Sequence, residues 1–522
     1  MRKIQVVSLL PLAIASTLAA AFPKFSKDDF SNPSGESAFG IVRSIELDDF
    51  AVASVRYLPD GQRVIVGSSD GRVALVDLAS ARAQWAVSPI ANFRDWISVL
   101  DVDPTGQKFV FIVSGDQGDA YMTLYIASTQ DGRILKKISG EKSNLYQKHF
   151  DYEIDLRYPG PDGEKKRLEE DNLAAYWLMV PYAARFTSKG GLITSWKNSA
   201  DTHAMYDRSF RLFDSNFRKV WEYQVKADEK TWDPLEPAGF KNGLPVPPIV
   251  EMTDGSFLFG TPHARVQQIT DALAKSNMKK PNLVDQAFAP VFANPKSIHS
   301  EFEDTAMPVS DLAVGADGKV YVSAGDGGQR QIYAFDGKTR REIFHSHEFD
   351  ASHVQISPNG KLLATGYLTG AGSRVHIIDL ERGKLLYMGP RFGSMNTGSV
   401  VWNPKFEQAA VASGSILLLS RREKQTVRVG TSWTRTGIFA RPGVSICGFG
   451  NGAVEITTDP KEGGYSFSES DDFFAGPDGR IAIPAEKAGE LYLKAESPGN
   501  WTIYGGLKSE EFSRGVKPVL WD

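Results

Sequence analysis

Cysteine and histidine are scarce in this sequence, and their scarcity excludes several kinds of site. Cys447 is the single cysteine in 522 residues, so the chain has no intramolecular disulfide framework and no cysteine-based zinc site. Its eight histidines form no HExxH motif. His345 and His347 fall on one side of an expected strand, a spacing that chance commonly produces. We therefore expect no metal site and no cofactor.

The protein also lacks an excess of charge, nucleotide-binding motifs and internal apolar runs. Its 59 basic and 63 acidic residues leave a net charge of −4, which gives no general attraction to nucleic acid or to an anionic membrane. It contains no Walker loop, no strand-linked GxGxxG and no GxSxG elbow. Beyond the N-terminus, no segment is apolar enough to span a bilayer. We expect no nucleic-acid partner and no membrane span.

The N-terminus has the pattern of a secretory signal peptide. A basic start, MRK, precedes the apolar stretch IQVVSLLPLAIASTLAA, and small residues lead to a cleavage site before Phe22. A membrane anchor is the alternative, but the apolar stretch is short for a spanning helix and Pro11 interrupts it. We predict that residues 1–21 are removed and that the mature protein is periplasmic or secreted.

Glycine and proline are plentiful, with 48 and 28 residues, and they punctuate a repeated unit. The stretch SHVQISPNGKLLATGYLTGAGSRVHIIDLERGKLLYM, from Ser352, places three strand-length apolar bursts between turn signals. The same order recurs from Val52, Trp96, Pro308 and Asn396, and degenerate copies start at Gly191 and Val246. Seven units of about 40 residues have the period of propeller blades, which must stack radially to bury both faces of each sheet.

The end of each unit carries the family resemblance. The residues are Asp77-Leu78, Asp214, Asp336-Gly337 and Asp379-Leu380, each close to the turn before the last strand. They resemble the blade endings of seven-bladed propellers of the WD-repeat, YVTN and quinoprotein-like superfamily. The resemblance implies an all-β fold, a seven-bladed β-propeller, and carries no activity by itself. No GH…WD signature recurs, and the first unit, with Ala74, Asp77 and Trp85, resembles a quinoprotein-type blade.

Four segments follow from these patterns. We expect the signal peptide at 1–21, a linker at 22–40, the propeller at 41–436 and a small β-sandwich at 437–522. An eighth blade is the alternative for the last segment, but no blade turn recurs there. Residues 41–47 are expected to complete the last blade beside the strand around Val427 and so to close the ring.

All long insertions fall on one face of the expected propeller. In antiparallel blades the connections alternate between two faces. The segments 139–172, 197–208, 226–244 and 270–307 all lie on the face opposite the tight turns. Because long irregular loops are uncommon unless they are functional or disordered, we predict that this face binds the ligand. The candidate binding residues are His203, Trp232, His263, Arg265, Asp326, Arg330 and His347. Trp196 and Trp433 are further recognition candidates near this face.

The function that these patterns favour is binding. We expect an exported module that recognises a protein, peptide or glycan through the face with the long loops. An enzyme with its site over the central channel, either quinone-dependent or a hydrolase or lyase, is the alternative. A structural scaffold in a larger assembly is the third. No catalytic residues can be assigned, because the motifs assemble no catalytic constellation.

Overall fold

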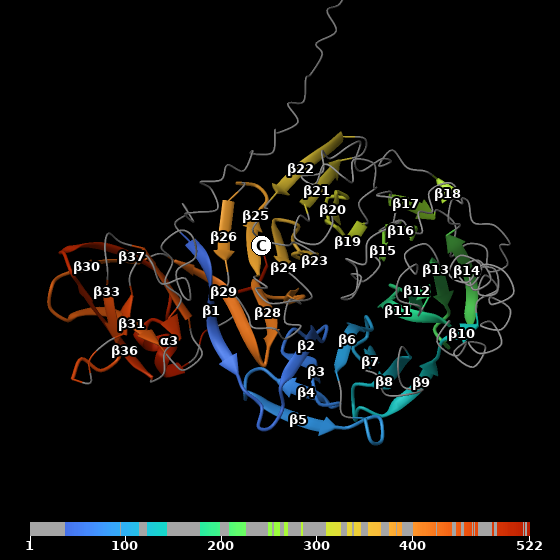
Figure 1. The fold of residues 1–522 in the computed structure, drawn as a ribbon, viewed down its shortest axis with the longest axis horizontal. Coiled ribbons are helices and arrows are strands. Elements are labelled where there is room, and N and C mark those ends of the chain that lie inside the picture. The colour runs from blue at the N-terminus through green and yellow to red at the C-terminus, as the bar shows by residue number, and fades with distance from the viewer. Residues whose placement is uncertain are drawn as a thin grey trace, which may run out of the picture.

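The fold is almost entirely β in the described part of the protein. The computed structural model describes residues 37–93, 96–113, 123–142, 178–198, 208–225, 249–252, 255–260, 266–269, 283–284, 309–324, 331–336, 339–345, 353–366, 375–382, 384–388, 400–423, 425–440, 445–449, 454–461, 463, 465–467, 483–484, 488–514, 516 and 519–521. Within these residues the one helix is α3 (Ser509–Arg514). Seven antiparallel sheets of the described residues stand around a ring, and two further sheets lie beside it (Figure 1).

The ring sheets follow one another in sequence order. The first is β2 (Val52–Tyr57), β3 (Arg63–Ser68), β4 (Val73–Asp77) and β5 (Arg82–Val87). The second is β6 (Ile97–Val102), β7 (Lys108–Val113), β8 (Leu124–Ser128) and β9 (Ile134–Ile138). The third is β10 (Glu141–Lys142), β11 (Leu178–Phe186), β12 (Leu192–Asn198), β13 (Arg208–Phe213) and β14 (Lys219–Val225). The fourth is β15 (Ile249–Glu251), β16 (Phe257–Gly260), β17 (Val266–Ile269) and β18 (Leu283–Val284).

The remaining ring sheets complete the circle. The fifth is β19 (Val309–Val314), β20 (Val320–Ala324), β21 (Gln331–Asp336) and β22 (Thr339–His345). The sixth is β23 (His353–Ile356), β24 (Leu362–Gly366), β25 (His376–Asp379) and β26 (Lys384–Met388). The seventh is β27 (Val400–Trp402), β28 (Gln408–Ser413), β29 (Ser415–Glu423) and β1 (Ser37–Ile45). The strands β2, β6, β11, β15, β19, β23 and β27, here called the inner strands, face the centre of the ring (Figure 1).

One kind of tight turn leads out of six of the inner strands. In each turn a glycine with positive φ donates its N–H to the carbonyl of the residue three positions earlier. The donors are Gly61, Gly106, Gly190, Gly255, Gly318 and Gly360. Glycine suits these positions because a side chain at positive φ is strained. These inner turns confirm the D/N-G-type turn signals in the sequence.

The aspartate that ends the third strand of several units stabilises the turn that follows it. The Asp77 Oδ1 accepts hydrogen bonds from the N–H and hydroxyl of Ser80, at 2.7 Å each. The Asp379 Oδ1 accepts the N–H groups of Glu381 and Arg382 at 3.0 and 2.9 Å. Each carboxylate thereby holds the turn into the fourth strand, as short polar side chains commonly do. The recurring Asp is therefore explained by turn formation.

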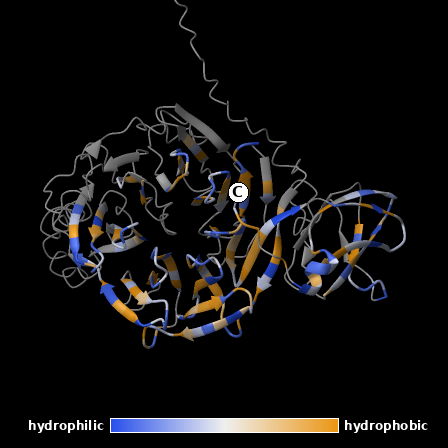
Figure 2. Cartoon of the chain, turned by 180° about the vertical axis from the view of Figure 1, so that it is seen from behind, coloured by the Kyte–Doolittle hydropathy of each residue, from blue (hydrophilic) through white to orange (hydrophobic). Residues whose placement is uncertain are grey.

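The hydrophobic core is divided among the spaces between neighbouring sheets. One cluster combines Val64 and Ala74 of the first sheet with Ala410 and Leu418 of the seventh. Other clusters join the first sheet to the second, the second to the third, the fifth to the sixth and the sixth to the seventh. Figure 2 shows the hydrophobic stretches along the ring strands. Among the described residues, these sheets bury their faces against their neighbours, which is the reason that the repeat stacks as a β-propeller.

The ring closes through the N-terminal strand, as expected, but with a different partner. Strand β1 pairs antiparallel with β29, with Ile41 opposite Leu419 and Ile45 opposite Ile416. The strand that contains Val427 instead pairs with a C-terminal strand, so that part of the prediction was wrong. Strand β1 also begins at Ser37, inside the segment expected to be a linker. Phe39 and Ile41 are buried in the core between the sixth and seventh sheets, and this burial accounts for the longer strand.

Two sheets of the C-terminal region share one core. The first has the order β30 (Gln425–Val429), β37 (Gly499–Gly505), β32 (Ser445–Phe449) and β35 (Ile483–Pro484). The second has the order β31 (Thr434–Ala440), β36 (Gly489–Ala495), β33 (Val454–Thr457) and β34 (Tyr465–Phe467). Val429 and Trp501 of the first sheet pack with Ile438 and Leu493 of the second. The C-terminal sheets therefore begin at Gln425, earlier than the expected boundary at Gly437.

The C-terminal region contacts the seventh ring sheet through strands β37 and β32, which lie against β1, and through two side-chain contacts. The buried Arg422 at the end of β29 forms a two-point ion pair with Glu511 of α3, at 3.0 and 2.6 Å. The last residues then return to the ring, where Leu520 bridges Phe406 and the Trp521 indole donates to the carbonyl of Asn403 at 2.8 Å. The C-terminus consequently lies against the ring (Figure 1).

Candidate functional site

All seven binding residues predicted from the sequence lie outside the residues that the structure describes. They are His203, Trp232, His263, Arg265, Asp326, Arg330 and His347. Most of the long insertions on the predicted binding face lie outside the described residues as well. The assignment of the binding site to that face therefore stays a prediction.

Of the other recognition candidates, Trp196 is not on the surface. Its side chain is 1% exposed, and its indole N–H donates to the Thr194 hydroxyl at 2.7 Å. The prediction failed because Trp196 lies on β12, where strand alternation turns it into the core between the second and third sheets. Trp433 is partly exposed, and the Lys494 ammonium lies 5.7 Å from the centre of its ring.

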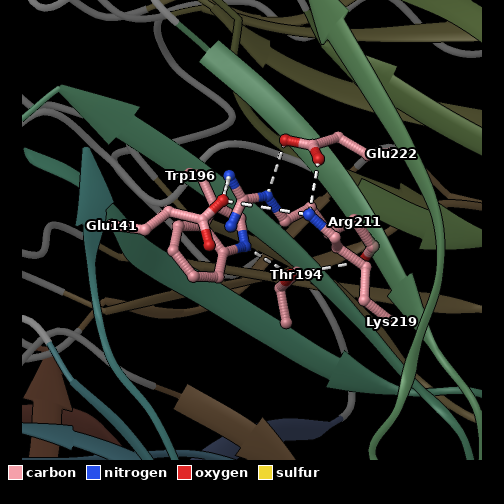
Figure 3. A network of polar contacts seen from close by, with 6 residues as sticks. All are labelled: Glu141, Thr194, Trp196, Arg211, Lys219 and Glu222. Atoms are coloured by element: carbon pink, nitrogen blue, oxygen red, sulfur yellow. Dashed lines mark hydrogen bonds and ion pairs between the residues drawn. The ribbon is translucent and has the colours of Figure 1, made fainter. Parts of the chain in front are cut away.

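Trp196 belongs to a buried polar network in the third sheet. The guanidinium of Arg211, 3% exposed, stacks on the Trp196 ring at 3.7 Å and pairs with Glu141 at 2.7 Å and Glu222 at 2.8 Å. Figure 3 draws its members, which are Glu141, Thr194, Trp196, Arg211, Lys219 and Glu222. Two carboxylates and an aromatic face already surround the Arg211 cation, so this network holds the sheet together and leaves no room for a ligand.

A cavity lies where the inner strands end and the inner turns begin. It measures about 480 Å³, within the range of roughly 300–1,000 Å³ typical of small-molecule sites. Its lining comes from the inner strands of six ring sheets and the turns that follow: Arg56, Tyr57, Pro59, Leu100, Asp101, Val102, Asp103, Pro104, Ala184, Arg185, Asp311, Gln355, Ile356, Pro358, Val401, Trp402 and Pro404. This end of the ring is opposite the face predicted to bind the ligand.

Arg56 of β2 is the most enclosed cation of the cavity. Its Nε donates to the carbonyl of Leu100 at 2.7 Å, and its Nη1 donates to the carbonyl of Val55 at 2.7 Å. In the described part of the protein, no carboxylate lies within ion-pair distance of its guanidinium. Burial lowers the pKa of Arg56 to about 10, although the more distant charges of Asp101 and Asp311 oppose this shift. The Arg56 cation is thus partly desolvated, and Asp101 and Asp311 offset this cost only from beyond ion-pair distance.

The carboxylates of the cavity are occupied by backbone donors. Asp101 accepts the N–H of Phe186 at 2.7 Å and the N–H of Val102 at 2.9 Å, one on each oxygen. Burial raises the pKa of Asp101, while the Phe186 N–H and the nearby arginines oppose the rise. Through the bond to Phe186, Asp101 joins the inner strands of the second and third sheets.

Asp311 makes a similar connection on the other side of the ring. It accepts the N–H of Leu312 at 2.8 Å and the N–H of Val354 at 3.0 Å, so it links β19 to β23. Arg185 of β11 also reaches Asp311, at 3.3 Å. Arg185 and Asp311 therefore form an ion pair across the channel, between the third and fifth sheets.

Aromatic and proline side chains form the remaining walls and the edge of the cavity. Trp402 packs edge-on against Trp521 at 5.6 Å and donates its indole N–H to the carbonyl of Gln355 at 3.1 Å. Burial raises the pKa of the Tyr57 phenol, which stays protonated and donates to Gln408 at 3.2 Å. Pro59, Pro104, Pro358 and Pro404 lie in the turn segments; we call them the proline rim.

The described lining of the cavity offers groups that can recognise a polar ligand. Arg56 and Asp101 have shifted pKa values, which is one mark of an active site. However, no Ser, Cys, Lys or His among the described residues lines the cavity, and both Asp101 oxygens already accept hydrogen bonds. Within the same described part, no group of three or more His, Cys, Asp and Glu side chains could hold a metal ion. Donors, acceptors and an aromatic wall remain, and these can bind a polar group.

The sequence contains a signal for this cavity in the spacing between charged residues and turn glycines. Arg56, Asp101 and Arg185 each stand five positions before the glycine of an inner turn, which is Gly61, Gly106 or Gly190. A charged residue in an otherwise apolar inner strand is a departure from the repeat. Because the units stack around an axis, equivalent positions of different units meet at the channel.

Comparisons with known proteins found a similarity in sequence and another in structure. The family model of the WD domain, G-beta repeat, matches residues 42–77, a span that covers the end of β1 and the strands β2, β3 and β4. The first unit therefore matches a WD repeat, one of the repeat types of the superfamily that the blade endings resemble. No curated protein matches this sequence. The crystal structure of the Cps50 (Swd1) β-propeller domain of Myceliophteria thermophila is 15% identical, with a TM-score of 0.43, over 73% of this chain and 99% of that chain.

Proposed function

We propose that the protein is an exported interaction module that binds a protein or peptide at the inner-turn end of its propeller. The observation that carries the proposal is the cavity among the inner strands, with an arginine that has no carboxylate of the described residues within 4 Å, an aromatic wall and a proline rim that is exposed except at Pro59. Arginine and aromatic residues are enriched at the centres of protein interfaces. WD-repeat propellers mediate protein interactions, and the match at residues 42–77 supports this general role.

Export is part of the proposal and depends on the N-terminal pattern. The basic start, apolar stretch and small residues before Phe22 support a cleaved signal peptide. No described helix is long and apolar enough to cross a membrane. The net charge of −4 argues against nucleic acid as the partner. N-terminal sequencing of the protein recovered from periplasm or medium should find Phe22 first.

The binding proposal is tested by capture with paired variants of the mature protein, residues 22–522. Pro104→Tyr together with Pro358→Tyr would fill the mouth of the cavity at two exposed rim positions. We expect partner capture from the periplasm or medium to fall at least about tenfold in this variant, since the partner loses access to the buried centre of the site. Lys136→Glu, on the exposed face of β9, is the matched control and should bind normally.

The alternative is that the partner binds the face with the long loops. His203→Ala together with Arg265→Ala should leave capture unchanged if the inner-turn end is the working surface. Loss of capture in this second variant, with normal capture by the proline-rim variant, would move the binding site to the opposite face. Capture of a polysaccharide in place of a protein would favour the glycan alternative.

A further inference from the structure

We infer that the cavity receives a carboxylate of the partner, which forms an ion pair with Arg56. This inference rests on the proposed function, because it names the chemical group that the same cavity recognises. The carboxylate can belong to an Asp or Glu side chain or to the free C-terminus of a peptide, and the test below separates these two sources.

The first reason is the hydrogen-bonding capacity that Arg56 leaves unused. A guanidinium carries five N–H donors in a rigid fork. The carbonyls of Leu100 and Val55 accept from Nε and Nη1, and the described residues supply no carboxylate within 4 Å. A carboxylate is the group that matches the remaining fork with two parallel hydrogen bonds.

The second reason is that the nearest acids of the protein are held elsewhere. Both Asp101 oxygens accept backbone N–H groups, one of them from the neighbouring sheet. Asp311 accepts two backbone N–H groups and pairs with Arg185. These hydrogen bonds hold both carboxylates in place on the inner strands, beyond ion-pair distance of Arg56. The fold therefore keeps its own acids away from Arg56.

The third reason is the cost of partly burying the Arg56 charge without an ion pair. A desolvated cation is unfavourable unless an anion offsets it. Asp101 and Asp311 act on Arg56 only from beyond ion-pair distance. An incoming carboxylate would supply the missing contact in an enclosed cavity, where a charge-assisted hydrogen bond is stronger than at the surface.

The cavity also has the dimensions and walls for such a group. Its volume of about 480 Å³ exceeds that of a single acidic side chain and leaves room for ordered water beside it. Trp402 and Tyr57 line the cavity, and the proline rim provides rigid surfaces at its edge. The backbone of a bound peptide would lie across this rim while its acid enters.

The test uses short peptides as probes and the mature protein, residues 22–522. The probes are acetyl-Gly-Glu-Gly-amide, its Gln counterpart, acetyl-Gly-Gly-Gly with a free C-terminus, and acetyl-Gly-Lys-Gly-amide. Binding is measured by titration calorimetry at low salt. We expect one of the two carboxylate probes to bind about 10- to 100-fold more tightly than the Gln probe, as a charged hydrogen bond is worth roughly that factor. Which of them binds identifies the source of the carboxylate.

Variants assign the effect to Arg56. Arg56→Gln should abolish the preference for the carboxylate probe, and Arg56→Lys should retain part of it. Arg133→Gln is the control, because Arg133 is largely exposed in a turn away from the cavity. If Arg56→Gln fails to fold, the binding preference of Arg56→Lys and a crystal structure of the wild-type complex test the inference instead. A carboxylate bound to Arg56 in that structure would support it.

Two outcomes would overturn the inference. One is that neither carboxylate probe binds more tightly than the Gln probe, and the other is preferential binding of the Lys probe, which would transfer recognition to Asp101. If either result is found and the proline-rim variant loses partner capture, the carboxylate inference is wrong but the proposed binding site stands. Normal capture by the proline-rim variant would remove the proposed function itself.

Discussion

At the scale of single residues, small and polar side chains join neighbouring sheets near the channel. The Ser54 hydroxyl donates to the carbonyl of Ile97 at 3.1 Å and accepts the N–H of Val99 at 2.8 Å. Ser54 thereby joins β2 to β6, in the same way that Asp101 joins β6 to β11. Such bonds require close approach of the sheets, and Gly67 provides the space for it.

Gly67→Ala should destabilise the ring. A Cβ at Gly67 would lie 2.2 Å from the carbonyl oxygen of Ile97 and 2.7 Å from the Ser54 hydroxyl, so the first and second sheets would have to separate. We expect a loss of about 1–3 kcal/mol in the free energy of unfolding, typical of overpacking, measured by urea denaturation. Gly430→Ala is the control, because its added Cβ would find no atom closer than 3.9 Å. Equal midpoints for the two variants would contradict this account.

At the scale of elements, the seventh ring sheet connects the two ends of the protein. It combines β1 from the N-terminal side with β27, β28 and β29. The ion pair of Arg422 and Glu511 fastens α3 to the end of β29, and Trp521 returns to Asn403 beyond β27. Ring closure and attachment of the C-terminal sheets consequently depend on the same element.

The attachment of α3 should weaken in acid. Burial alone would raise the pKa of Glu511, but the Arg422 guanidinium and the Lys508 N–H outweigh it and hold the pKa below the usual 4.5. A carboxyl group with a lowered pKa contributes stability above its unfolded pKa and loses it as the pH falls through the folded value. We expect the protection of α3 amides from hydrogen exchange, relative to the intrinsic rate at each pH, to fall below about pH 4.5, measured by mass spectrometry.

Glu511→Gln provides the comparison for the acid effect. This variant should show lower protection of α3 already at about pH 7 and little further change in protection on acidification. Glu455→Gln, which alters an ion pair on the C-terminal sheets, should keep the wild-type acid response of α3. An unchanged acid response in Glu511→Gln would show that another group controls the attachment.

At the scale of the whole molecule, a ring of sheets is joined to a pair of sheets with a separate core. The core of the C-terminal pair includes Val429 and Ile438, and Trp501 and Leu493 face them. Each ring core, by contrast, is shared between adjacent ring sheets. This division of the hydrophobic core is the physical basis for proposing two folding units.

The fragment 425–522 should unfold cooperatively by itself. It retains β30 and β31, which pair with β37 and β36, and it keeps the whole C-terminal core. A fragment that starts at Gly437 lacks β30 and Val429 and should melt without a cooperative transition, as followed by circular dichroism. If the fragment that starts at Gly437 unfolds cooperatively and the fragment 425–522 does not, the boundary lies at Gly437.

The parts of the fold that the sequence predicted depend on interactions between residues close together in the chain. Repeated turn glycines such as Gly61 and Gly360, and strand-ending aspartates such as Asp77, act within a few residues along the sequence. Their spacing therefore identified the repeated unit, the all-β class and the propeller. The positions of most C-terminal strands also followed from alternation and turn signals.

Only the tertiary structure decided what depends on contacts between distant segments. Pairing selected β29 rather than the strand around Val427 as the partner of β1, because burial of Phe39 and Ile41 fixes that register. Radial stacking brought Arg56, Asp101, Arg185 and Asp311 to one cavity, although up to 255 positions separate them. A strand's own sequence shows which residues alternate, but the neighbouring sheets determine which of them meet at the axis.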